Sequence, residues 1–574
     1  MTVKPWTERW PGRLEWELAQ LEAAGMRHVA HEPDAHGIVR IDVVHTVEGM
    51  DYELEAYFPQ LYPYFRPEVR SKANFDFHQE PFGNGLCLVA RDPGLWSPED
   101  SLAAFLAKQL PLIVAANAPD ADRADDVEEQ VPEPIRENYD YPDGDFVLVD
   151  SAWTIPGDVE HGTLDVGVIA AELPLRAAVL AVRGPDDKVL AQVDGRLRNL
   201  FKTYIFQARW TRVSEPIVQQ TGPEYLAALE SLRPNSARRG PWRDLGRHHI
   251  DLVGVLYPDE IRYADYGDDW VFLLRVRERR SSNRAVAPTA AHLIRALRSG
   301  TEDMAARVPQ LRGLRDKKVA VFGLGALGAP AATALARSGI GRLSLIDKDF
   351  VDPATTPRWP QGILASGMRK VQAVGAFVAQ NYPYTAVELA AWRLGDTGND
   401  KVNDVVILNH VLADADLILD ATANTAANHA LADAAWELGI PYVCVSATAG
   451  AWGGIVVCIE RGRTACWSCF NAALDATIPL PPADDSPTGR ITPVACSETT
   501  FTGAGFDLTP LSDEAVRSVV SRLSADVVGG YPAMSWSVEV LALRSPDGEP
   551  IPPSWSAFPL PPQADCPYGM CNAA

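Results

Sequence analysis

Positive charge and cysteine are scarce in this sequence. Its 574 residues carry 52 Lys and Arg against 75 Asp and Glu, which gives a formal net charge of −23. So acidic a chain is repelled by phosphate backbones, and we expect no nonspecific binding to nucleic acid. Its 8 cysteines are too few for a disulfide scaffold, and no charged and then apolar segment opens the chain as a secretion signal would. We therefore expect a cytoplasmic protein whose cysteines are metal ligands or nucleophiles.

Long uninterrupted apolar runs are also missing. The stretch 438–459 is uncharged and long enough to suggest a membrane span, but Pro441 interrupts it, as do glycines at positions 439, 450, 453 and 454. Two buried strands joined by a turn fit these residues better, so we expect no membrane partner. Hydrophobic residues still make up 47% of the chain, and its length predicts three or four domains.

The sequence does contain a strand, a glycine turn, a helix, a second strand and an acid, in that order, over residues 317–349. An alanine-rich helix follows the turn to about Ser338, and the second strand stops at Asp347. Glycines let the backbone approach a phosphate closely, and the helix N-terminus offers unpaired N–H groups to the anion. Asp347 lies where an acid meets a ribose hydroxyl. The pattern predicts a nucleotide site whose glycines are Gly323, Gly325 and Gly328.

The residues after Asp347 indicate which nucleotide binds. Asp349, Arg358 and Lys370 follow it, and two spaced cations suit a triphosphate better than a nicotinamide. An NAD-dependent dehydrogenase would also need a hydride-transfer site built around a His or Lys, and none is evident. We therefore expect ATP.

The run DKDFV at 347–351, then Arg358, then GMRK at 367–370, resembles the adenylation domain of ubiquitin-activating enzymes and of the ThiF and MoeB-like enzymes that activate sulfur-carrier proteins. The resemblance implies a Rossmann-like α/β domain in which Asp347 holds the ATP ribose and Asp349 lies beside it. It implies that Arg358 and Lys370 bind the phosphates and stabilise the departing pyrophosphate.

Two positions depart from the family pattern. The family has an Asn where this chain has Thr355, and Ala423 stands where an acid that holds Mg²⁺ is expected. Asp420, at the end of the preceding strand, is one alternative ligand for Mg²⁺; the other is that the metal is held differently.

Two pairs of cysteines lie about a hundred residues apart, Cys466 with Cys469 and Cys566 with Cys571. Four thiolates close a tetrahedral structural Zn²⁺ site, as adenylation domains of this family often have. The alternative is that the second pair belongs to a frayed tail. Of the remaining cysteines, Cys444 and Cys458 lie in apolar segments and are expected to be core residues.

Cys496 follows a Pro-rich stretch, 478–493, that is typical of a mobile crossover loop. By the resemblance it is the thioester cysteine of the activating enzyme, although Ser497 replaces the usual Thr. A passive loop cysteine is the alternative.

The front of the chain predicts a helix over 12–24 and strands over 37–47 and 51–58, followed by a Tyr-Pro turn. His78, Gly85-Leu-Cys87-Leu and Trp96-Ser-Pro, opening a helix to about Ala116, come next. This order is similar to ubiquitin-conjugating enzymes, whose cysteine accepts the thioester, and so implies that Cys87 is a second nucleophile. The family's His-Pro-Asn is His-Gln-Glu here, which leaves the oxyanion role unassigned; His78 could serve it or merely pin the loop.

Four segments are expected in an α/β and α+β multidomain fold. Residues 1–118 form a ubiquitin-conjugating-like α+β domain, 119–145 an acidic linker, 146–284 a mixed α/β middle domain of unknown role, and 285–574 the Rossmann-like ThiF adenylation domain with zinc knuckles. A helical lead-in is expected from about Ala285. Related adenylation domains are dimers or pseudodimers, so a homodimer is implied, in which Arg307, Arg312 or Arg315 reaches the partner's ATP site.

Together the two resemblances point to bacterial fusions of conjugating and activating enzymes, as found in CBASS antiphage and related ubiquitin-like operons. They imply a relay in which ATP adenylates the C-terminal carboxylate of a protein, Cys496 and then Cys87 carry the acyl group, and an acceptor amine receives it. The substrate would be a ubiquitin-like protein or a cyclic-nucleotide synthase. The alternatives are a sulfur-carrier adenylyltransferase without conjugating activity and a scaffold with an inactive front domain.

Overall fold

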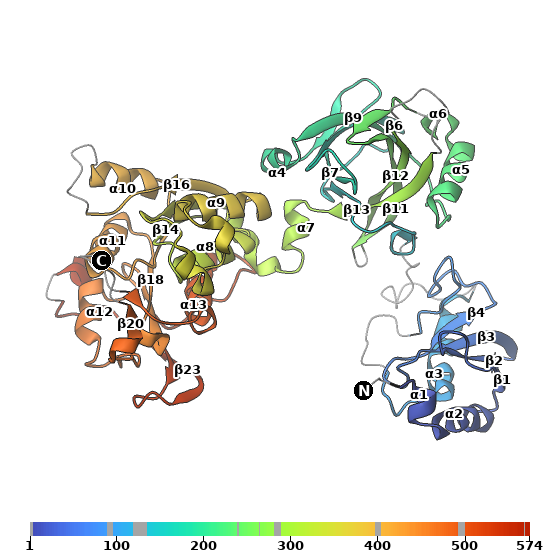
Figure 1. The fold of residues 1–574 in the computed structure, drawn as a ribbon, viewed down its shortest axis with the longest axis horizontal. Coiled ribbons are helices and arrows are strands. Elements are labelled where there is room, and N and C mark those ends of the chain that lie inside the picture. The colour runs from blue at the N-terminus through green and yellow to red at the C-terminus, as the bar shows by residue number, and fades with distance from the viewer. Residues whose placement is uncertain are drawn as a thin grey trace. The chain divides into compact units, whose positions relative to one another are not determined.

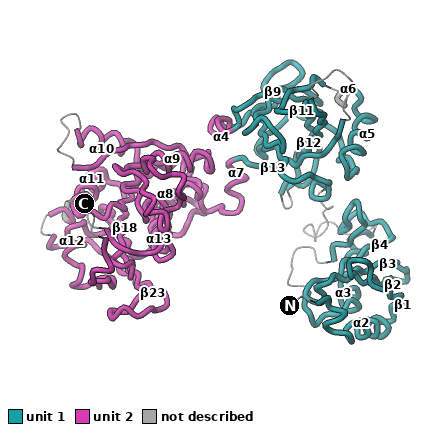
Figure 2. Tube along the Cα trace, viewed as in Figure 1, with its two compact units in different colours: residues 1–193, 201–300 teal, residues 194–200, 301–574 magenta. Residues whose placement is uncertain are grey.

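A computed structural model describes residues 4–88, 96–118, 135–237, 240–262, 265–279, 289–395, 403–491, 500–566 and 569–573. The chain divides into two compact units (Figure 2). Unit 1 comprises residues 1–193 and 201–300, and unit 2 comprises residues 194–200 and 301–574. Figure 1 labels the helices and strands of both.

Unit 1 begins with a small antiparallel sheet packed against helices. Buried side chains that alternate along β2, namely Val39, Ile41 and Val43, share one hydrophobic core with Leu21 of α2 and Leu106 of α3. The elements are α1 (Trp6–Arg9), α2 (Gly12–Ala23), β1 (Arg27–Ala30), β2 (Val39–Val47), β3 (Met50–Phe58), β4 (Glu68–Ser71) and α3 (Leu102–Ala116), with the strands in the order β1-β2-β3-β4.

The last helix of this part begins later than predicted. It was expected from Trp96 but starts at Leu102, because the Ser101 side chain caps it by accepting a hydrogen bond from the Ala104 N–H at 3.1 Å. The Trp96 indole instead donates to the Pro63 carbonyl at 2.8 Å.

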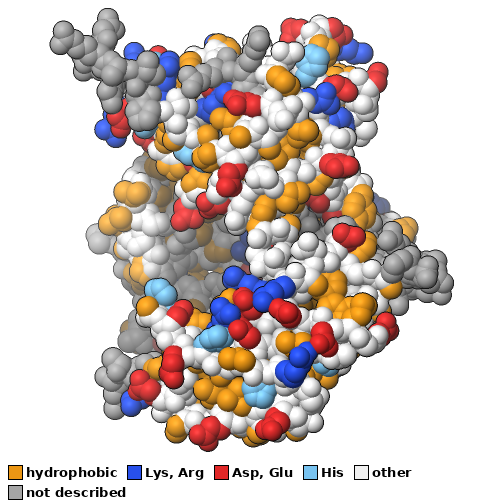
Figure 3. Space-filling view, turned by 90° about the vertical axis from the view of Figure 1, so that its right-hand side faces the viewer, with side chains coloured by type: hydrophobic (Ala, Val, Ile, Leu, Met, Phe, Trp, Pro, Cys, Tyr) orange, Lys and Arg blue, Asp and Glu red, His pale blue; other side chains and the backbone are white. Residues whose placement is uncertain are grey.

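Charged side chains of this sheet are paired at the surface. Arg40 lies 2.7 Å from Asp42, and Lys72 lies 2.7 Å from Glu53. Figure 3 likewise shows acidic and basic side chains next to one another, with small hydrophobic areas between them. Exposed pairs of this kind contribute little stability individually.

The second part of unit 1 is a β-barrel. Among the described residues, seven strands pair in the order β11-β12-β13-β5-β7-β6-β9, and β9 pairs back onto β11, which closes the sheet. The strands are β5 (Phe146–Val149), β6 (His161–Val168), β7 (Arg176–Arg183), β9 (Tyr204–Arg212), β11 (His248–Arg262), β12 (Asp265–Glu278) and β13 (Ala290–Arg298), with β8 (Val189–Gln192) and β10 (Arg243–Leu245) added at β7 and β11.

Two hydrophobic clusters hold the barrel together. Leu164, Val179 and Phe272 belong to one of them, and Val253 and Tyr225 to the other. Along β11, Ile250 and Leu252 belong to the first cluster and Val253 belongs to the second. Because successive side chains of a strand point to opposite sides, the two clusters lie on opposite faces of the barrel sheet. The second cluster is covered by α5 (Gly222–Leu232), and η2 (Ile135–Glu137) and α6 (Pro234–Ala237) are the other short helices.

The expected helical lead-in from about Ala285 is wrong for residues 290–298 but is present further on, in α7 (Thr301–Ala305) and η3 (Pro309–Asp316). Residues 290–298 form β13, which pairs antiparallel with β12 and parallel with β5. Leu293 and Ile294 are fully buried in the two clusters, so packing inside the barrel decides against a helix. The structure therefore divides the chain after Gly300 rather than at residue 285.

Unit 2 is a doubly wound α/β domain. Among the described residues, its main sheet has the order β16-β15-β14-β17-β18-β19-β22-β23, parallel from β16 to β18 and antiparallel beyond. The strands are β14 (Lys318–Phe322), β15 (Arg342–Ile346), β16 (Ala386–Ala390), β17 (Leu417–Asp420), β18 (Tyr442–Ala447), β19 (Gly453–Ile459), β22 (Val538–Arg544) and β23 (Pro550–Phe558), and β20 (Arg490–Ile491) pairs with β21 (Thr500–Phe501).

Helices cover both faces of this sheet. Leu335, Val374 and Leu511 bring α8 (Gly328–Arg337), α9 (Lys370–Asn381) and α13 (Gly505–Ser524) into one core. Val411 and Leu431 bring α10 (Asp404–Leu412) and α11 (Thr425–Leu438) into the other, together with α12 (Trp467–Ala473). The shorter helices are α4 (Gly195–Leu200), α7 (Thr301–Ala305), η3 (Pro309–Asp316), η4 (Pro353–Arg358), η5 (Ile363–Ala365), η6 (Ala449–Ala451), η7 (Pro487–Gly489) and η8 (Met570–Ala573).

The apolar stretch 438–459 forms the two buried strands that the sequence predicted, because β18 and β19 pair antiparallel within it. In the described part of the chain, no helix combines the length and the apolar character that a membrane crossing requires.

Candidate functional site

The glycine turn lies between β14 and α8, where two of its glycines are sterically required. A Cβ on Gly328 would lie 1.8 Å from the Gly323 carbonyl oxygen, and a Cβ on Gly323 would lie 2.7 Å from the Ala421 oxygen. Gly323 also has φ +83°, which disfavours other residues. Gly325 has no atom within 4 Å of its Cβ position, and it lines a cavity.

That cavity of about 190 Å³ lies at the carboxyl ends of the parallel strands. The chain passes from β14 to β15 on one side and later returns to β17 on the other, so the cavity occupies the switch point of the sheet, where ligands bind in such folds. One group of lining residues is polar, namely Gly323, Gly325, Asp347, Lys348, Asp349, Lys370, Arg393, Thr422 and Asn424. The other is mainly apolar, namely Phe322, Ile346, Trp392, Leu394, Ala421, Ala427 and Leu431.

Asp347 fixes the shape of this cavity. Its two oxygens accept hydrogen bonds from the Leu324 N–H at 2.6 Å and from the Asp349 N–H at 2.7 Å. The Lys370 Nζ lies 3.1 Å from an Asp349 oxygen and 3.9 Å from Asp347. The structure thus brings Gly323, Gly325, both aspartates and Lys370 to one cavity, whereas Gly328 does not line it.

Arg358 does not line the cavity. Its guanidinium donates to the Phe501 carbonyl and the Thr500 hydroxyl, and it lies 5.0 Å from the centre of the Phe501 ring. Burial lowers its pKa. Arg358 is therefore directed at β21 rather than at the cavity.

Asp420 is fully buried, and both of its oxygens are already engaged. They accept hydrogen bonds from Thr422 N–H and Oγ1 at 2.9 and 2.7 Å, from Asn428 at 2.9 Å and from Tyr442 at 2.8 Å. This carboxylate positions the 421–424 loop and leaves no oxygen directed at the cavity.

Asp349 is a better candidate ligand for a magnesium ion. Its side chain is 51% exposed and lines the cavity. Mg²⁺ typically binds one or two protein carboxylates and takes its other oxygens from phosphates and water, so Asp349 fits this requirement.

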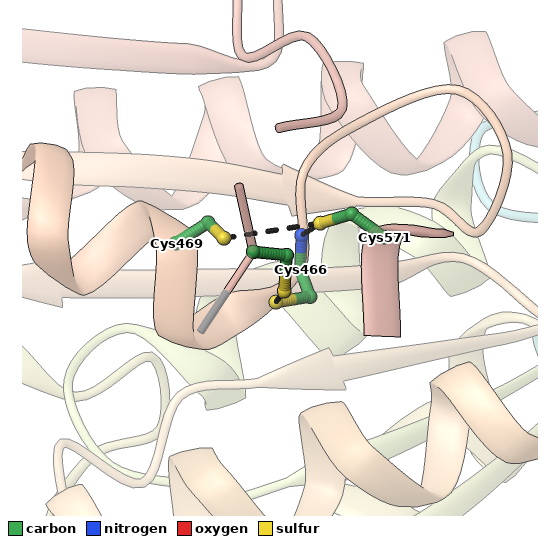
Figure 4. Close-up of side chains that lie close together, drawn as sticks. Cys466, Cys469 and Cys571 are labelled. Carbon is green, nitrogen blue, oxygen red and sulfur yellow. Dashed lines mark hydrogen bonds between the residues drawn. The ribbon is translucent and has the colours of Figure 1, made fainter. Parts of the chain in front are cut away.

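The four predicted zinc ligands converge in unit 2. Their sulfur atoms all lie within 4.8 Å of one another, and the pairs Cys466–Cys566 and Cys469–Cys571 are each 3.8 Å apart. Tetrahedral ligation with Zn–S bonds of about 2.3 Å separates sulfurs by about 3.8 Å, so the geometry fits zinc. Figure 4 shows the thiols of Cys469 and Cys571 facing each other from α12 and the C-terminal turn.

Two further cysteines of unit 2, Cys444 and Cys458, are core residues, as expected. Cys444 and Cys458 are buried in β18 and β19, and burial raises the pKa of the Cys458 thiol to about 11. The pKa of Cys444 is raised well above its ordinary value for the same reason.

The two predicted nucleophiles are placed differently. Cys496 lies outside the described residues. Cys87 is half-buried, and its N–H donates to the His78 carbonyl at 2.8 Å, which puts His78 across from it. His78 has φ +61°, an uncommon conformation for a non-glycine residue. The neighbouring Gln79 bonds to Phe75 and Ala73, so it fixes the loop.

The three candidate arginines lie apart from the cavity. Arg312 and Arg315 both pair with Glu302, at 3.1 and 2.7 Å, and neither they nor Arg307 lines the cavity.

Sequence reasoning missed one wall of the cavity. Trp392, Arg393 and Leu394 line it directly after β16. The only sequence feature that could have indicated these residues is their place directly after a strand, because the loops that follow parallel strands converge at the same edge of the sheet. Lys348 lies inside the recognised motif, but it was assigned no role.

The fold and the cavity define a doubly wound α/β domain with a cavity at its switch point, and comparison with known proteins gives its family. Residues 302–529 match the ThiF family. Over nearly its whole length the chain is 30% identical to the uncharacterized protein y4oA of Sinorhizobium fredii (98% of this chain, 97% of y4oA) and 31% identical to y4qC of the same organism (96% and 95%). The chain belongs to the family of these two proteins.

More distant relatives match a smaller share of the chain. Ubiquitin-like modifier-activating enzyme 5 of Bombyx mori is 30% identical over 29% of this chain and 42% of its own length. The probable adenylyltransferase/sulfurtransferase MoeZ of Mycobacterium tuberculosis is 33% identical over 25% of this chain and 32% of its own length. The crystal structure of E. coli MccB aligns with a TM-score of 0.34 and 15% identity, over 46% of this chain and 72% of that chain. The ThiF match over residues 302–529, with the two sequence relatives above, identifies a ThiF/MoeB-like adenylation domain in the C-terminal region.

Proposed function

We propose that this chain uses ATP to adenylate the C-terminal carboxylate of a protein substrate. The observation that carries this proposal is the convergence of the glycine turn, Asp347, Asp349 and Lys370 on one cavity of a ThiF-family domain. The N-terminus of α8 and Lys370 supply positive charge for the triphosphate, and Asp347 meets the ribose.

In the adenylation step, a carboxylate oxygen of the substrate attacks the α-phosphorus of ATP. The bond from that phosphorus to the bridging oxygen breaks, and pyrophosphate leaves. Lys370 stabilises the charge that develops on the phosphates. Mg²⁺ held by Asp349 would neutralise further phosphate charge.

The acyl group then passes between two cysteines. The Cys496 thiolate attacks the acyl-adenylate and releases AMP, and the Cys87 thiolate takes the acyl group by thioester exchange. An acceptor amine finally forms an amide and frees Cys87. Arg358 hydrogen-bonds to Thr500 and Phe501, which follow Cys496 by a few residues in the sequence.

The wider setting is part of the proposal. Residues 1–118 act as a ubiquitin-conjugating domain, and zinc bound by Cys466, Cys469, Cys566 and Cys571 stabilises unit 2. The enzyme is a cytoplasmic homodimer in a bacterial ubiquitin-like, antiphage pathway of the CBASS type, and its substrate is a ubiquitin-like protein or a cyclic-nucleotide synthase.

Pyrophosphate exchange tests the first step. The purified protein, given ATP, labelled pyrophosphate and a candidate substrate, should return label to ATP, and Cys496→Ala should retain this exchange. If the wild type gives no exchange with any neighbouring-gene product that ends in a free tail, the adenylation proposal fails.

Nonreducing gels test the relay. We expect two thiol-sensitive adducts with the substrate, both lost in Cys496→Ala and only the later one lost in Cys87→Ala. Cys458→Ala is the matched control, because this buried core thiol should not affect either adduct.

A sulfur-carrier adenylyltransferase is the second candidate, because the adenylyltransferase/sulfurtransferase MoeZ is similar to only 25% of this chain. It predicts exchange with no effect of Cys87→Ala on any product. An inactive front domain that serves as a scaffold predicts the Cys496 adduct without the Cys87 adduct.

A further inference from the structure

The nucleotide cavity has one wall with no assigned role. Trp392 follows β16, its side chain is only 8% exposed, and it lines the cavity together with Ile346 and Leu394. The Trp392 N–H donates to the Ala390 carbonyl at 3.0 Å, so the chain turns immediately after the strand.

The strand order indicates which part of a nucleotide reaches this wall. The glycine turn follows β14, Asp347 follows β15, and Trp392 follows β16, and these three strands are adjacent in the sheet. A phosphate at the glycine turn and a ribose at Asp347 leave the base to continue in the direction of β16. The base therefore arrives among Ile346, Trp392 and Leu394.

We infer that the Trp392 indole is the surface on which the base of the nucleotide packs, and that Asp404 holds this indole in position. The inference deepens the proposed ATP site and rests on it. It makes Trp392 the residue that distinguishes a nucleoside triphosphate from a bare polyphosphate.

Asp404, at the start of α10, accepts hydrogen bonds from two residues of the segment 392–395. One carboxylate oxygen accepts a hydrogen bond from the Trp392 indole N–H at 3.0 Å, and the other accepts from the Gly395 N–H at 2.8 Å. A single carboxylate thus bridges both ends of the segment 392–395. A buried indole needs only one acceptor for its N–H. The second hydrogen bond, from the Gly395 N–H, is therefore not needed to bury the indole.

Packing alone is the competing explanation, because Trp392 also belongs to the hydrophobic core beside α10 and α11. The two explanations differ in what they predict for ligands. A purely structural tryptophan affects ATP and inorganic tripolyphosphate alike, or neither. A base-binding tryptophan affects ATP alone.

Calorimetric titration of the full-length protein with ATP and with inorganic tripolyphosphate separates them. Trp392→Leu should weaken ATP binding by about 10-fold or more, the range of aromatic stacking on a base, and leave tripolyphosphate binding unchanged. Lys370→Met should weaken both ligands. Trp555→Leu, a change at a half-exposed tryptophan of β23, should weaken neither.

Asp404→Asn provides a second variant that keeps the indole. As a positioning change it should raise the KM for ATP in pyrophosphate exchange and leave kcat unchanged, whereas a general folding defect would lower kcat as well. Asp513→Asn, on the exposed side of α13, is its control. Loss of the ATP-induced change in tryptophan fluorescence in Trp392→Phe would add a spectroscopic signature.

Each outcome decides one question. If Trp392→Leu binds ATP as tightly as the wild type, or loses ATP and tripolyphosphate equally, the inference is overturned and the ATP site stands. If the wild type binds neither ligand, the proposed function itself is wrong. If the wild type binds ATP no more tightly than tripolyphosphate, no base is recognised and the inference fails.

Discussion

The carboxyl group of Glu539, on β22, is buried next to a second carboxyl group, that of Glu514. It is 6% exposed, accepts a hydrogen bond from the Trp536 indole at 2.5 Å, and faces Glu514. Burial, and then the neighbouring Glu514, raise its pKa to about 8. Between about pH 4.5 and pH 8, Glu539 is therefore protonated in the folded state and ionised in the unfolded state, whose pKa is the ordinary 4.5.

This difference predicts how stability depends on pH. The contribution of protonated Glu539 is fully present below about pH 4.5 and is lost as the pH rises through about 8. Glu539→Gln mimics the protonated form, so its melting temperature relative to the wild type should increase between pH 5.5 and 8.5. Exposed Glu549→Gln should show no such trend, and a pH-independent difference for Glu539→Gln would contradict the prediction.

Ala423 has a backbone conformation that alanine rarely adopts. It has φ +52°, in the left-handed region that favours glycine, Asn and Asp. The family pattern expects an acid there, which suits this backbone conformation. The loop keeps the conformation because Asp420 holds Thr422 at two atoms.

The β14–α8 turn, an element rather than a single residue, shows why the glycines differ in importance. Gly328→Ala would place a methyl group 1.8 Å from the Gly323 oxygen and should destabilise the fold by about 3 kcal/mol or more. Gly325→Ala meets no atom within 4 Å and should change stability by less than about 0.5 kcal/mol, yet weaken ATP binding because its methyl group enters the cavity. Denaturant unfolding and ATP titration of both variants measure this contrast.

The cysteine cluster connects two elements that are distant in sequence, α12 and η8. Metal analysis should find one Zn²⁺ per chain, and Cys571→Ser should lose it, lower the melting temperature and expose the C-terminal segment to protease. Removing the metal with a chelator should reproduce the effect. Cys444→Ala, which alters a buried thiol outside the cluster, should retain the zinc. Full zinc content in Cys571→Ser would show that the four thiols are not the site.

At the scale of the whole molecule, the two compact units predict separable unfolding. Calorimetry should show at least two transitions, and a single two-state transition would contradict this organisation. ATP at about 100 times its Kd should stabilise only the transition of unit 2, by about 2.7 kcal/mol. A chelator should lower that same transition, since the cysteine cluster lies in unit 2.

The sequence by itself determined the parts of this protein whose signals are local. The glycine turn, Asp347, Asp349 and Lys370 lie within 48 consecutive residues, so their order and spacing can be recognised without knowledge of distant segments. Alternating apolar residues similarly predicted β2 and β3. The composition of 438–459 predicted its two strands.

Only the tertiary structure decided the features that depend on distant segments. Residues 290–298 become a strand because β12 and β5 offer edges on both sides, although the local sequence also allows a helix. Asp420 becomes a buried anchor because Thr422, Asn428 and Tyr442 surround its oxygens, and Arg358 turns from the cavity to Phe501. Trp392 reaches the cavity because three parallel strands end side by side, a juxtaposition that no local pattern records.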